Sequence, residues 1–258
     1  MRMNNPSVQL DVIEKIDQVC HEGREFNNYS WVPMGLGELW GVINYGQSRG
    51  LINPGQTVLD MGSGSGSSSL LWGVRGYNVI GIELYKKLAD ASKESIMICK
   101  RGIPKPKGIE TMMRCTSMIP KGIDIKVFHG SYYPKSYIEK RENGESIAKH
   151  IEDALCFIMS GDSVFHPVCS QDVYEKHNID LKSIDVFYAY IWGIQGPSIM
   201  EMFMEYAHDD ATLCITGKTH TEIIKRIGLR PVQNYDSELY NFRYMKKPEA
   251  NGGNNSSL

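Results

Sequence analysis

Apolar and polar positions follow two alternating periods along this chain. Short apolar runs predict strands at 57–61, 78–82, 125–128, 185–190 and 211–216. Apolar residues at helical spacing predict helices near 8–20, 36–43, 67–76, 85–101, 197–206 and 219–228. Strands that alternate with helices are typical of an α/β domain with a mostly parallel sheet.

The C-terminal part of the pattern differs from the rest. The runs 229–233 and 240–245 follow each other closely, so we expect them to form an antiparallel pair. Together with the five earlier runs they predict a seven-stranded, mostly parallel sheet with helices on both faces and an antiparallel C-terminal strand. The predicted fold class is therefore a three-layer α/β sandwich.

The spacing of the runs also predicts the domain organisation. About fifty residues separate the third and fourth strands, more than an α/β crossover needs, so residues 134–180 are predicted to be an insertion, helical around 147–159. The mixed charges of 135–153 indicate a solvated helix face. Residues 1–247 are expected to form one domain, and 248–258 a tail with nothing to bury.

Composition narrows the class of protein. The 258 residues are 41% hydrophobic and 22% charged, with a net charge of −2, which gives no electrostatic signal for nucleic acid. The first ten residues lack the apolar segment of a secretory signal, and the apolar stretch 186–194 is too short to span a bilayer. A cytoplasmic protein is expected. Its six scattered cysteines are expected to be free thiols: Cys20, Cys99, Cys115, Cys156, Cys169 and Cys214.

A glycine-dense turn, V-L-D-M-G-S-G-S-G at 58–66, joins the first strand to a helix. A P-loop requires a lysine, and none occurs between Gly62 and Arg75. The dinucleotide fingerprint requires a third glycine at position 67, where Ser67 stands, and a start at Gly64 would require it at Ser69. The loop therefore excludes a P-loop and disfavours a dinucleotide site.

The remaining pattern, D-x-G-x-G-x-G, resembles that of class I S-adenosylmethionine (SAM) methyltransferases. Glu83 ends the second strand, V-I-G-I-E, 23 residues after Asp60. The resemblance implies that Glu83 accepts hydrogen bonds from both ribose hydroxyls, and that Asp60 orients the loop or binds the amino end of SAM. It implies cofactor contacts from Asp60, Gly62, Ser63, Gly64, Gly66, Glu83 and Leu84.

Two further segments resemble a subgroup of small archaeal, bacterial and mitochondrial methyltransferases, several of which act on protein lysines. Residues 31–43, W-V-P-M-G-L-G-E-L-W-G-V-I, are similar to its lid-side helix, and Glu38 matches an acid near the amino end of SAM. Residues 1–50 are thus expected to form a helical lid segment. In the fourth-strand region, Tyr190 matches a strand-end tyrosine.

These resemblances imply methyl transfer to a protein lysine or another amine. A small-molecule N- or O-methyltransferase is the alternative, and a non-catalytic SAM-binding module is a third reading. The third strand ends F-H-G-S-Y-Y-P, where Ser131 replaces the family's adenine-binding aspartate. Ser131 and the adjoining Tyr132 are expected to contact the cofactor. The fourth strand lacks an N-P-P-Y motif, which argues against methylation of adenine N6 or glutamine.

Methyl transfer depends mainly on positioning, and a general base is needed only for a protonated acceptor. Candidates at the mouth of the site are Tyr190, Trp192, Gln195, Tyr132, Tyr133 and His129. Of these, Tyr190, Trp192 and His129 are the catalytic candidates, although Tyr190 and Trp192 equally fit a buried strand. No metal is predicted, because the spacing of Cys156, His166, Cys169 and His177 matches no zinc pattern.

Overall fold

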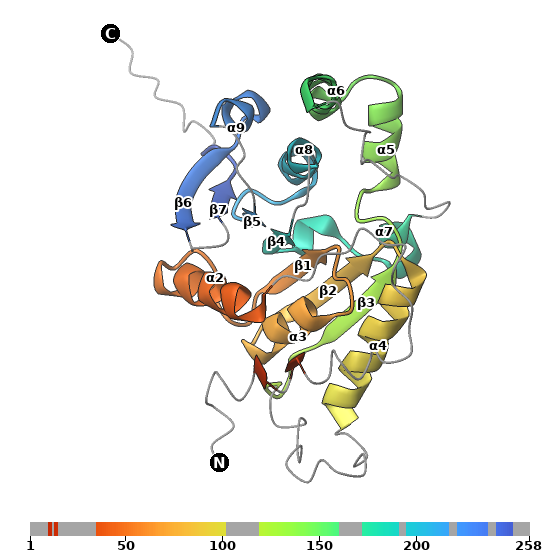
Figure 1. The fold of residues 1–258 in the computed structure, drawn as a ribbon, viewed down its shortest axis with the longest axis vertical. Helices are drawn as coiled ribbons and strands as arrows, with labels where there is room; N and C mark the ends of the chain where they lie inside the picture. The colour runs from red at the N-terminus through yellow and green to blue at the C-terminus, as the bar shows by residue number, and fades with distance from the viewer. Residues whose placement is uncertain are drawn as a thin grey trace.

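A computed structural model describes residues 10, 11, 13, 14, 35–101, 119–159, 172–190, 195–216, 221–236 and 241–249. In this part of the chain, seven strands form one sheet in the order β3-β2-β1-β4-β5-β7-β6 (Figure 1). The strands are β1 (Thr57–Met61), β2 (Asn78–Glu83), β3 (Ile125–His129), β4 (Val186–Ala189), β5 (Thr212–Thr216), β6 (Arg230–Asp236) and β7 (Asn241–Lys246). The predicted strands are confirmed, with boundaries that agree to within three residues.

The pairing of the strands confirms the predicted topology. Strands β3, β2, β1, β4 and β5 are parallel to their neighbours. Strand β7 is antiparallel to both β5 and β6, so the C-terminal pair is antiparallel as expected. The carboxyl ends of β1 to β5 therefore meet at one edge of the sheet.

Helices cover both faces of the sheet (Figure 1). One face carries α2 (Leu36–Ser48), α3 (Ser67–Val74) and α4 (Lys86–Arg101). The other face carries α5 (Lys135–Glu142), α7 (Val173–His177), the 3-10 helix η2 (Leu181–Ser183), α8 (Gly196–Tyr206) and α9 (Thr221–Ile227). The helix α6 (Ile147–Met159) packs on α8 and α9. The result is the predicted three-layer sandwich.

Alternating side chains on each strand build two hydrophobic cores. Val58 and Val186 face α2, α3 and α4, whereas Leu59 and Phe187 face the helices of the opposite layer. All four are fully buried. This follows from the two-residue period of a strand, which sends successive side chains to opposite faces. Both faces are apolar because a parallel sheet is covered on both sides.

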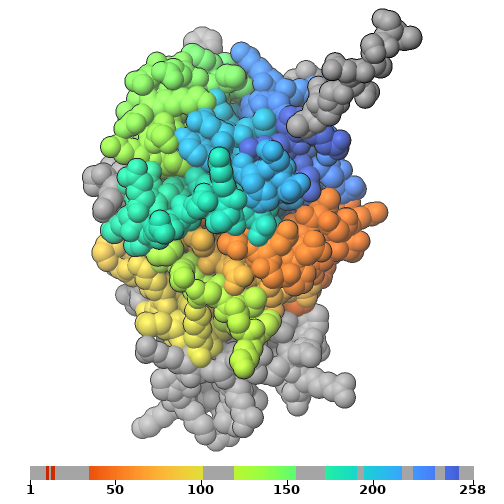
Figure 2. All heavy atoms as spheres, turned by 180° about the vertical axis from the view of Figure 1, so that it is seen from behind, coloured from red at the N-terminus to blue at the C-terminus, as the bar shows by residue number. Residues whose placement is uncertain are grey.

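The residues between β3 and β4 are largely helical. The helix expected around 147–159 is α6, and α5 and α7 lie on either side of it in the sequence. Figure 2 shows the green helices of 135–159 lying against the blue C-terminal elements rather than projecting from the domain, and α6 packs against α8 and α9. Whether 134–180 is a separable insertion in a domain of 1–247 stays a prediction.

The expectation that the charges of 135–153 form a solvated face is wrong for two residues. Arg141 is 5% exposed and Glu152 is 3% exposed, and their side chains form an ion pair of 2.9 Å. Glu152 is buried because it continues the face of α6 that also carries Ala148 and Ile151. The guanidinium of Arg141 offsets part of the cost of burying that carboxylate, and burial still raises the pKa of Glu152.

Several expectations concern residues that the structure does not describe. The helix predicted at 8–20 is described at positions 10, 11, 13 and 14 only, and these are helical. Trp192, Cys156 beyond its backbone, Cys169, His166 and the tail from 250 lie outside the described residues. Among the helices that are described, none has the length and apolarity needed to cross a membrane.

Candidate functional site

The glycine-dense turn forms a loop, Gly62–Gly66, at the carboxyl ends of β1 and β2. The φ angles of Gly62, Gly64 and Gly66 are 79°, 56° and 95°, a region that residues with a Cβ seldom adopt. The N–H groups of Gly62 and Ser63 donate to the Ile82 carbonyl at 2.9 and 3.1 Å. The loop therefore turns back over the end of β2, and its three glycines are required by the backbone.

Asp60, near the end of β1, is 1% exposed. Its Oδ2 accepts hydrogen bonds from the Ser68 hydroxyl at 2.7 Å and the Ser69 hydroxyl at 2.6 Å. Burial raises the Asp60 pKa to about 6, although the two serine hydroxyls favour the charged form. The carboxylate thus ties the end of β1 to the first turn of α3, and its role toward a ligand stays a prediction.

Glu83, at the end of β2, is also buried. Its Oε2 accepts a hydrogen bond from the Gly64 N–H at 2.9 Å, and its Oε1 accepts one from the Tyr85 N–H at 2.8 Å. Burial raises the pKa of Glu83, and these backbone donors partly oppose that shift. An ionised carboxylate has about four acceptor sites, so Glu83 keeps capacity for ligand hydroxyls while the loop holds it in place.

One observation indicates that a ligand fits beside this loop. A Cβ added to Gly62 would meet no described atom within 4 Å, so the space next to it is open. The Ser63 side chain is buried against Gly81 of β2, so its hydroxyl does not face that space. The open space and the buried Glu83 carboxylate fit the polar groups of SAM.

The segment after β3 lies at the same edge of the sheet. Ser131 is buried, and its Oγ accepts a hydrogen bond from the Tyr133 N–H at 3.0 Å. The Tyr132 hydroxyl donates to Gln195 Oε1 at 2.7 Å, and the Tyr174 hydroxyl donates to the Tyr132 carbonyl at 2.7 Å. Burial is the largest of the causes that raise the Tyr132 pKa, so its phenol stays protonated at neutral pH.

The other predicted site residues lie in different environments. Tyr190 follows β4, is half-buried, and packs against the core cluster of the face that carries α3. Leu84 follows Glu83 and is half-buried. His129 ends the edge strand β3 and is exposed, and Glu38 is half-buried in the first turn of α2. The roles of these four residues, and that of Trp192, stay predictions.

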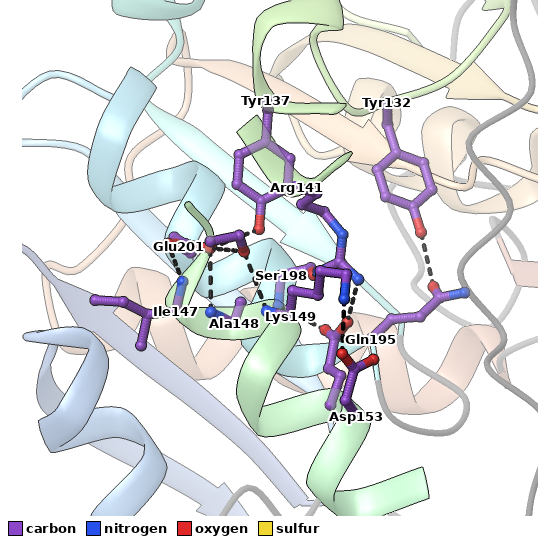
Figure 3. A network of polar contacts seen from close by, with 12 residues as sticks. Tyr132, Tyr137, Arg141, Ile147, Ala148, Lys149, Asp153, Gln195, Ser198 and Glu201 are labelled. Atoms are coloured by element: carbon purple, nitrogen blue, oxygen red, sulfur yellow. Dashed lines mark hydrogen bonds and ion pairs between the residues drawn. The ribbon is translucent and has the colours of Figure 1, made fainter. Parts of the chain in front are cut away.

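A buried polar network attaches α6 to α8 (Figure 3). Arg141 donates to the Ser198 hydroxyl, and Glu152 Oε1 accepts a hydrogen bond from the Ser198 N–H at 2.9 Å. Ser198 lies in the first turn of α8, whose N-terminal N–H groups lack partners within the helix. Glu152 of α6 therefore caps α8.

The reverse contact also exists, because Glu201 of α8 caps α6. Its Oε1 accepts a hydrogen bond from the Ile147 N–H at 3.0 Å, and its Oε2 accepts one from the Ala148 N–H at 3.2 Å. The sequence carries one sign of this network: Glu152 lies on the face of α6 that also carries Ala148 and Ile151, where an apolar residue is expected.

Comparison with known proteins agrees with this architecture. No protein-family model matches the chain, and no curated protein matches its sequence. Among solved structures, a protein of Pyrococcus horikoshii assigned as an RNA methyltransferase has a TM-score of 0.50 at 12% identity, over 93% of this chain and 98% of that one. The chain has the class I methyltransferase fold.

Two further structures with the methyltransferase fold are similar at lower scores. The ribosomal protein L11 methylase of Lactobacillus delbrueckii subsp. bulgaricus has a TM-score of 0.47 at 13% identity, over 82% of this chain and 80% of that one. The magnesium protoporphyrin IX methyltransferase of Synechocystis PCC 6803, solved with SAM, has a TM-score of 0.46 at 10% identity, over 92% of this chain and 98% of that one.

Proposed function

We propose that this protein is a SAM-dependent methyltransferase. The observation that carries the proposal is the arrangement at the carboxyl ends of β1 and β2. Three glycines with positive φ form the loop there, and the buried Glu83 carboxylate is held by the N–H of Gly64. In open α/β sheets, ligands lie outside the carboxyl ends of the strands. The loop and Glu83 occupy that place in a sheet with the methyltransferase fold.

In the proposed mechanism each residue binds or orients. SAM supplies, when bound, a methyl group on a positively charged sulfur. Glu83 accepts hydrogen bonds from the ribose hydroxyls, and the N–H groups at the start of α3 favour the amino-acid carboxylate. Asp60 holds the loop through Ser68 and Ser69 and places negative charge near a cationic ligand. Rate enhancement then follows from alignment of the acceptor with the methyl group.

For the acceptor we propose an amine, with a protein lysine as first choice. The similarity of 31–43 and of the fourth-strand region around Tyr190 to the lysine-methylating subgroup supports this choice. Aromatic side chains such as Tyr190 and Trp192 suit a cationic group through cation–π attraction. A cytoplasmic location is also proposed, and it is supported by Cys99 and Cys214, which are buried free thiols.

A small-molecule acceptor is the second candidate, and one observation favours it. The α6 helix is fixed to α8 by the hydrogen bond from the Ser198 N–H to Glu152, and to α5 by the buried pair of Arg141 and Glu152. A rigidly held helix beside the start of α8 suits a small enclosed acceptor better than a large protein surface.

One experiment separates these candidates. The protein is incubated with methyl-labelled SAM and a cell lysate divided by size. Label on protein bands supports a lysine acceptor, and label in the small-molecule fraction alone supports the second candidate. If neither fraction carries label, and calorimetry detects no binding of SAM or of its demethylated product S-adenosylhomocysteine, the proposed function is wrong.

A further inference from the structure

One hydrogen bond crosses the edge of the sheet at which the candidate site lies. The Tyr132 hydroxyl donates to Gln195 Oε1 at 2.7 Å (Figure 3). Tyr132 lies just after β3, and Gln195 immediately precedes α8, the helix that follows β4. In the sheet, β2 and β1 lie between β3 and β4. The bond therefore spans the ends of the two strands that carry Glu83 and Asp60.

The bond and the glycine loop belong to opposite faces of the sheet. Tyr132 packs against the core cluster beneath α5 to α9. Asp60 bonds to α3, which covers the other face. Glu83 is nevertheless near Tyr132. Burial is the main cause that raises the pKa of the Tyr132 phenol, and the charge of Glu83 raises it further. Tyr132 and Gln195 therefore lie across the edge of the sheet from α3 and close to Glu83.

The direction of this hydrogen bond limits what Tyr132 can do. A phenol has one proton and can both donate and accept. Its proton is directed to Gln195, so the oxygen of Tyr132 can only accept hydrogen bonds. The adjoining Tyr133 hydroxyl is one donor to this oxygen, which leaves its second lone pair for a group of a ligand. A neutral amine that donates an N–H to this oxygen keeps its lone pair free for the methyl group. An O–H group could donate to the same oxygen, so the pair suits an acceptor that carries a hydrogen on its nucleophilic atom. For the amine of the proposed function, that hydrogen belongs to an N–H.

We propose that Tyr132 and Gln195 form a positioning pair for a nitrogen acceptor, in which Tyr132 accepts a hydrogen bond from the nucleophilic nitrogen and Gln195 fixes the direction of the hydroxyl. The inference rests on the proposed function, and it assigns Tyr132 to the acceptor rather than to the cofactor. In the transfer, the nitrogen lone pair forms the new N–C bond and the S–C bond breaks. The electron pair of that bond stays on sulfur, and the nitrogen proton leaves to water.

The test uses two ligands and needs no knowledge of the acceptor. In sinefungin, a carbon bearing an amino group replaces the sulfonium and its methyl, so an amine points toward the acceptor side; S-adenosylhomocysteine has no such group. In calorimetry, Tyr132→Phe should lower the affinity for sinefungin about tenfold, as expected for the loss of one hydrogen bond to a charged group. The affinity of this variant for S-adenosylhomocysteine should change by less than about twofold.

A second variant and a control complete the test. Gln195→Ala should also weaken sinefungin selectively, because the Tyr132 hydroxyl loses its fixed direction; this variant carries the test if Tyr132→Phe does not fold. Tyr206→Phe is the matched control, because it removes a tyrosine hydroxyl that pairs with Ser136 Oγ at 2.7 Å on an exposed part of α8. It should change neither affinity.

Two results would overturn the positioning pair. If Tyr132→Phe lowered the affinities for both ligands equally, Tyr132 would contact the cofactor and not the acceptor. If the affinity for sinefungin were unchanged in both variants, neither residue would position an amine. Failure of the unaltered protein to bind either ligand is a different result, because it would refute the proposed function itself.

Discussion

The Asp60 carboxyl combines deep burial with a pKa of about 6, which places its ionisation in the range of ordinary buffers. Because SAM is cationic at its sulfur and ammonium, an ionised Asp60 favours its binding. We expect SAM affinity to rise severalfold between pH 5 and pH 7, and Asp60→Asn to remove most of that rise. Calorimetry across this range measures it. A flat profile for the unaltered protein would contradict a role of Asp60 near the ligand.

Asp60 also affects the stability of the fold, which its ionisation lowers, whereas its ionisation raises the affinity for SAM. Its pKa is raised from 3.8 on folding, so the native state binds the proton more tightly. The stability it contributes is full below pH 3.8 and is lost as pH rises through about 6. The difference between a pKa of 3.8 and one of about 6 corresponds to about 3 kcal/mol. Ligand-free Asp60→Asn should therefore be up to about 3 kcal/mol more stable at pH 7 in denaturant unfolding.

At the residue scale, local spacing was sufficient for one half of the site. Asp60, the glycines and Glu83 each lie within a few residues of a strand end, so the pattern of strands predicts that they meet at one edge. The hydrogen bond from Tyr132 to Gln195 joins residues 63 positions apart. Its existence and direction depend on tertiary packing, which no spacing in the sequence encodes.

At the scale of elements, Gly66 controls how α3 packs on α4. Its φ is 95°, and a Cβ there would lie 2.2 Å from Ser92 Oγ and 3.0 Å from Ser92 Cα. Gly66→Ala should destabilise the protein by about 2–4 kcal/mol, from backbone strain plus the clash. Gly144 is the control, because its φ is 77° but a Cβ would meet nothing within 4 Å.

Gly144→Ala should lower the free energy of unfolding by about 1 kcal/mol, from the strain of a positive φ alone. Denaturant unfolding of the two variants measures the difference. Equal losses would show that the contact of α3 with Ser92 does not restrict position 66.

Glu201 tests whether the capping of α6 by α8 stabilises the fold. Glu201→Ala leaves the N–H groups of Ile147 and Ala148 without their acceptor, so we expect a loss of about 2–4 kcal/mol in denaturant unfolding. Glu205→Ala is the control: it lies on the same helix and pairs with the partly exposed Lys140 at 2.7 Å, which predicts a loss below about 1 kcal/mol. Similar losses would contradict the cap.

The pH dependence of Glu201 has a definite sign. Burial acts to raise its pKa, but hydrogen bonds from Ser146 and the Ile147 N–H outweigh it, so the pKa lies below 4.5. Its stabilising contribution is therefore present above pH 4.5 and is lost as pH falls through the lowered pKa. The stability difference between the unaltered protein and Glu201→Ala should shrink in acid.

Prediction of the elements was better than prediction of their contacts. Hydrophobic periodicity located α6 because the period of an isolated helix is encoded locally. It assigned Arg141 and Glu152 to solvent because charged side chains are usually exposed. Their burial depends on α8, whose Ser198 lies 46 residues beyond Glu152.

At the scale of the whole molecule, the order of the strands joins these parts into one site. Placing β1 and β4 side by side, with β2 and β3 beyond β1, brings the loop, Glu83, Tyr132 and Gln195 to one edge. Alternating strands and helices predicted the class of fold. The sequence left the acceptor open because the residues around it come from loops and from α8, whose relative positions are set by tertiary packing.

The central claim is that the loop and Glu83 bind SAM, and calorimetric titration of SAM into the protein and into Glu83→Ala tests it most directly. Glu83→Ala removes the acceptor for ribose hydroxyls and for the N–H groups of Gly64 and Tyr85, so affinity should fall about 10- to 100-fold. The control Glu142→Ala, an exposed acid on α5, should bind like the unaltered protein. Absence of SAM binding by the unaltered protein, or equal affinity in Glu83→Ala, would contradict the account.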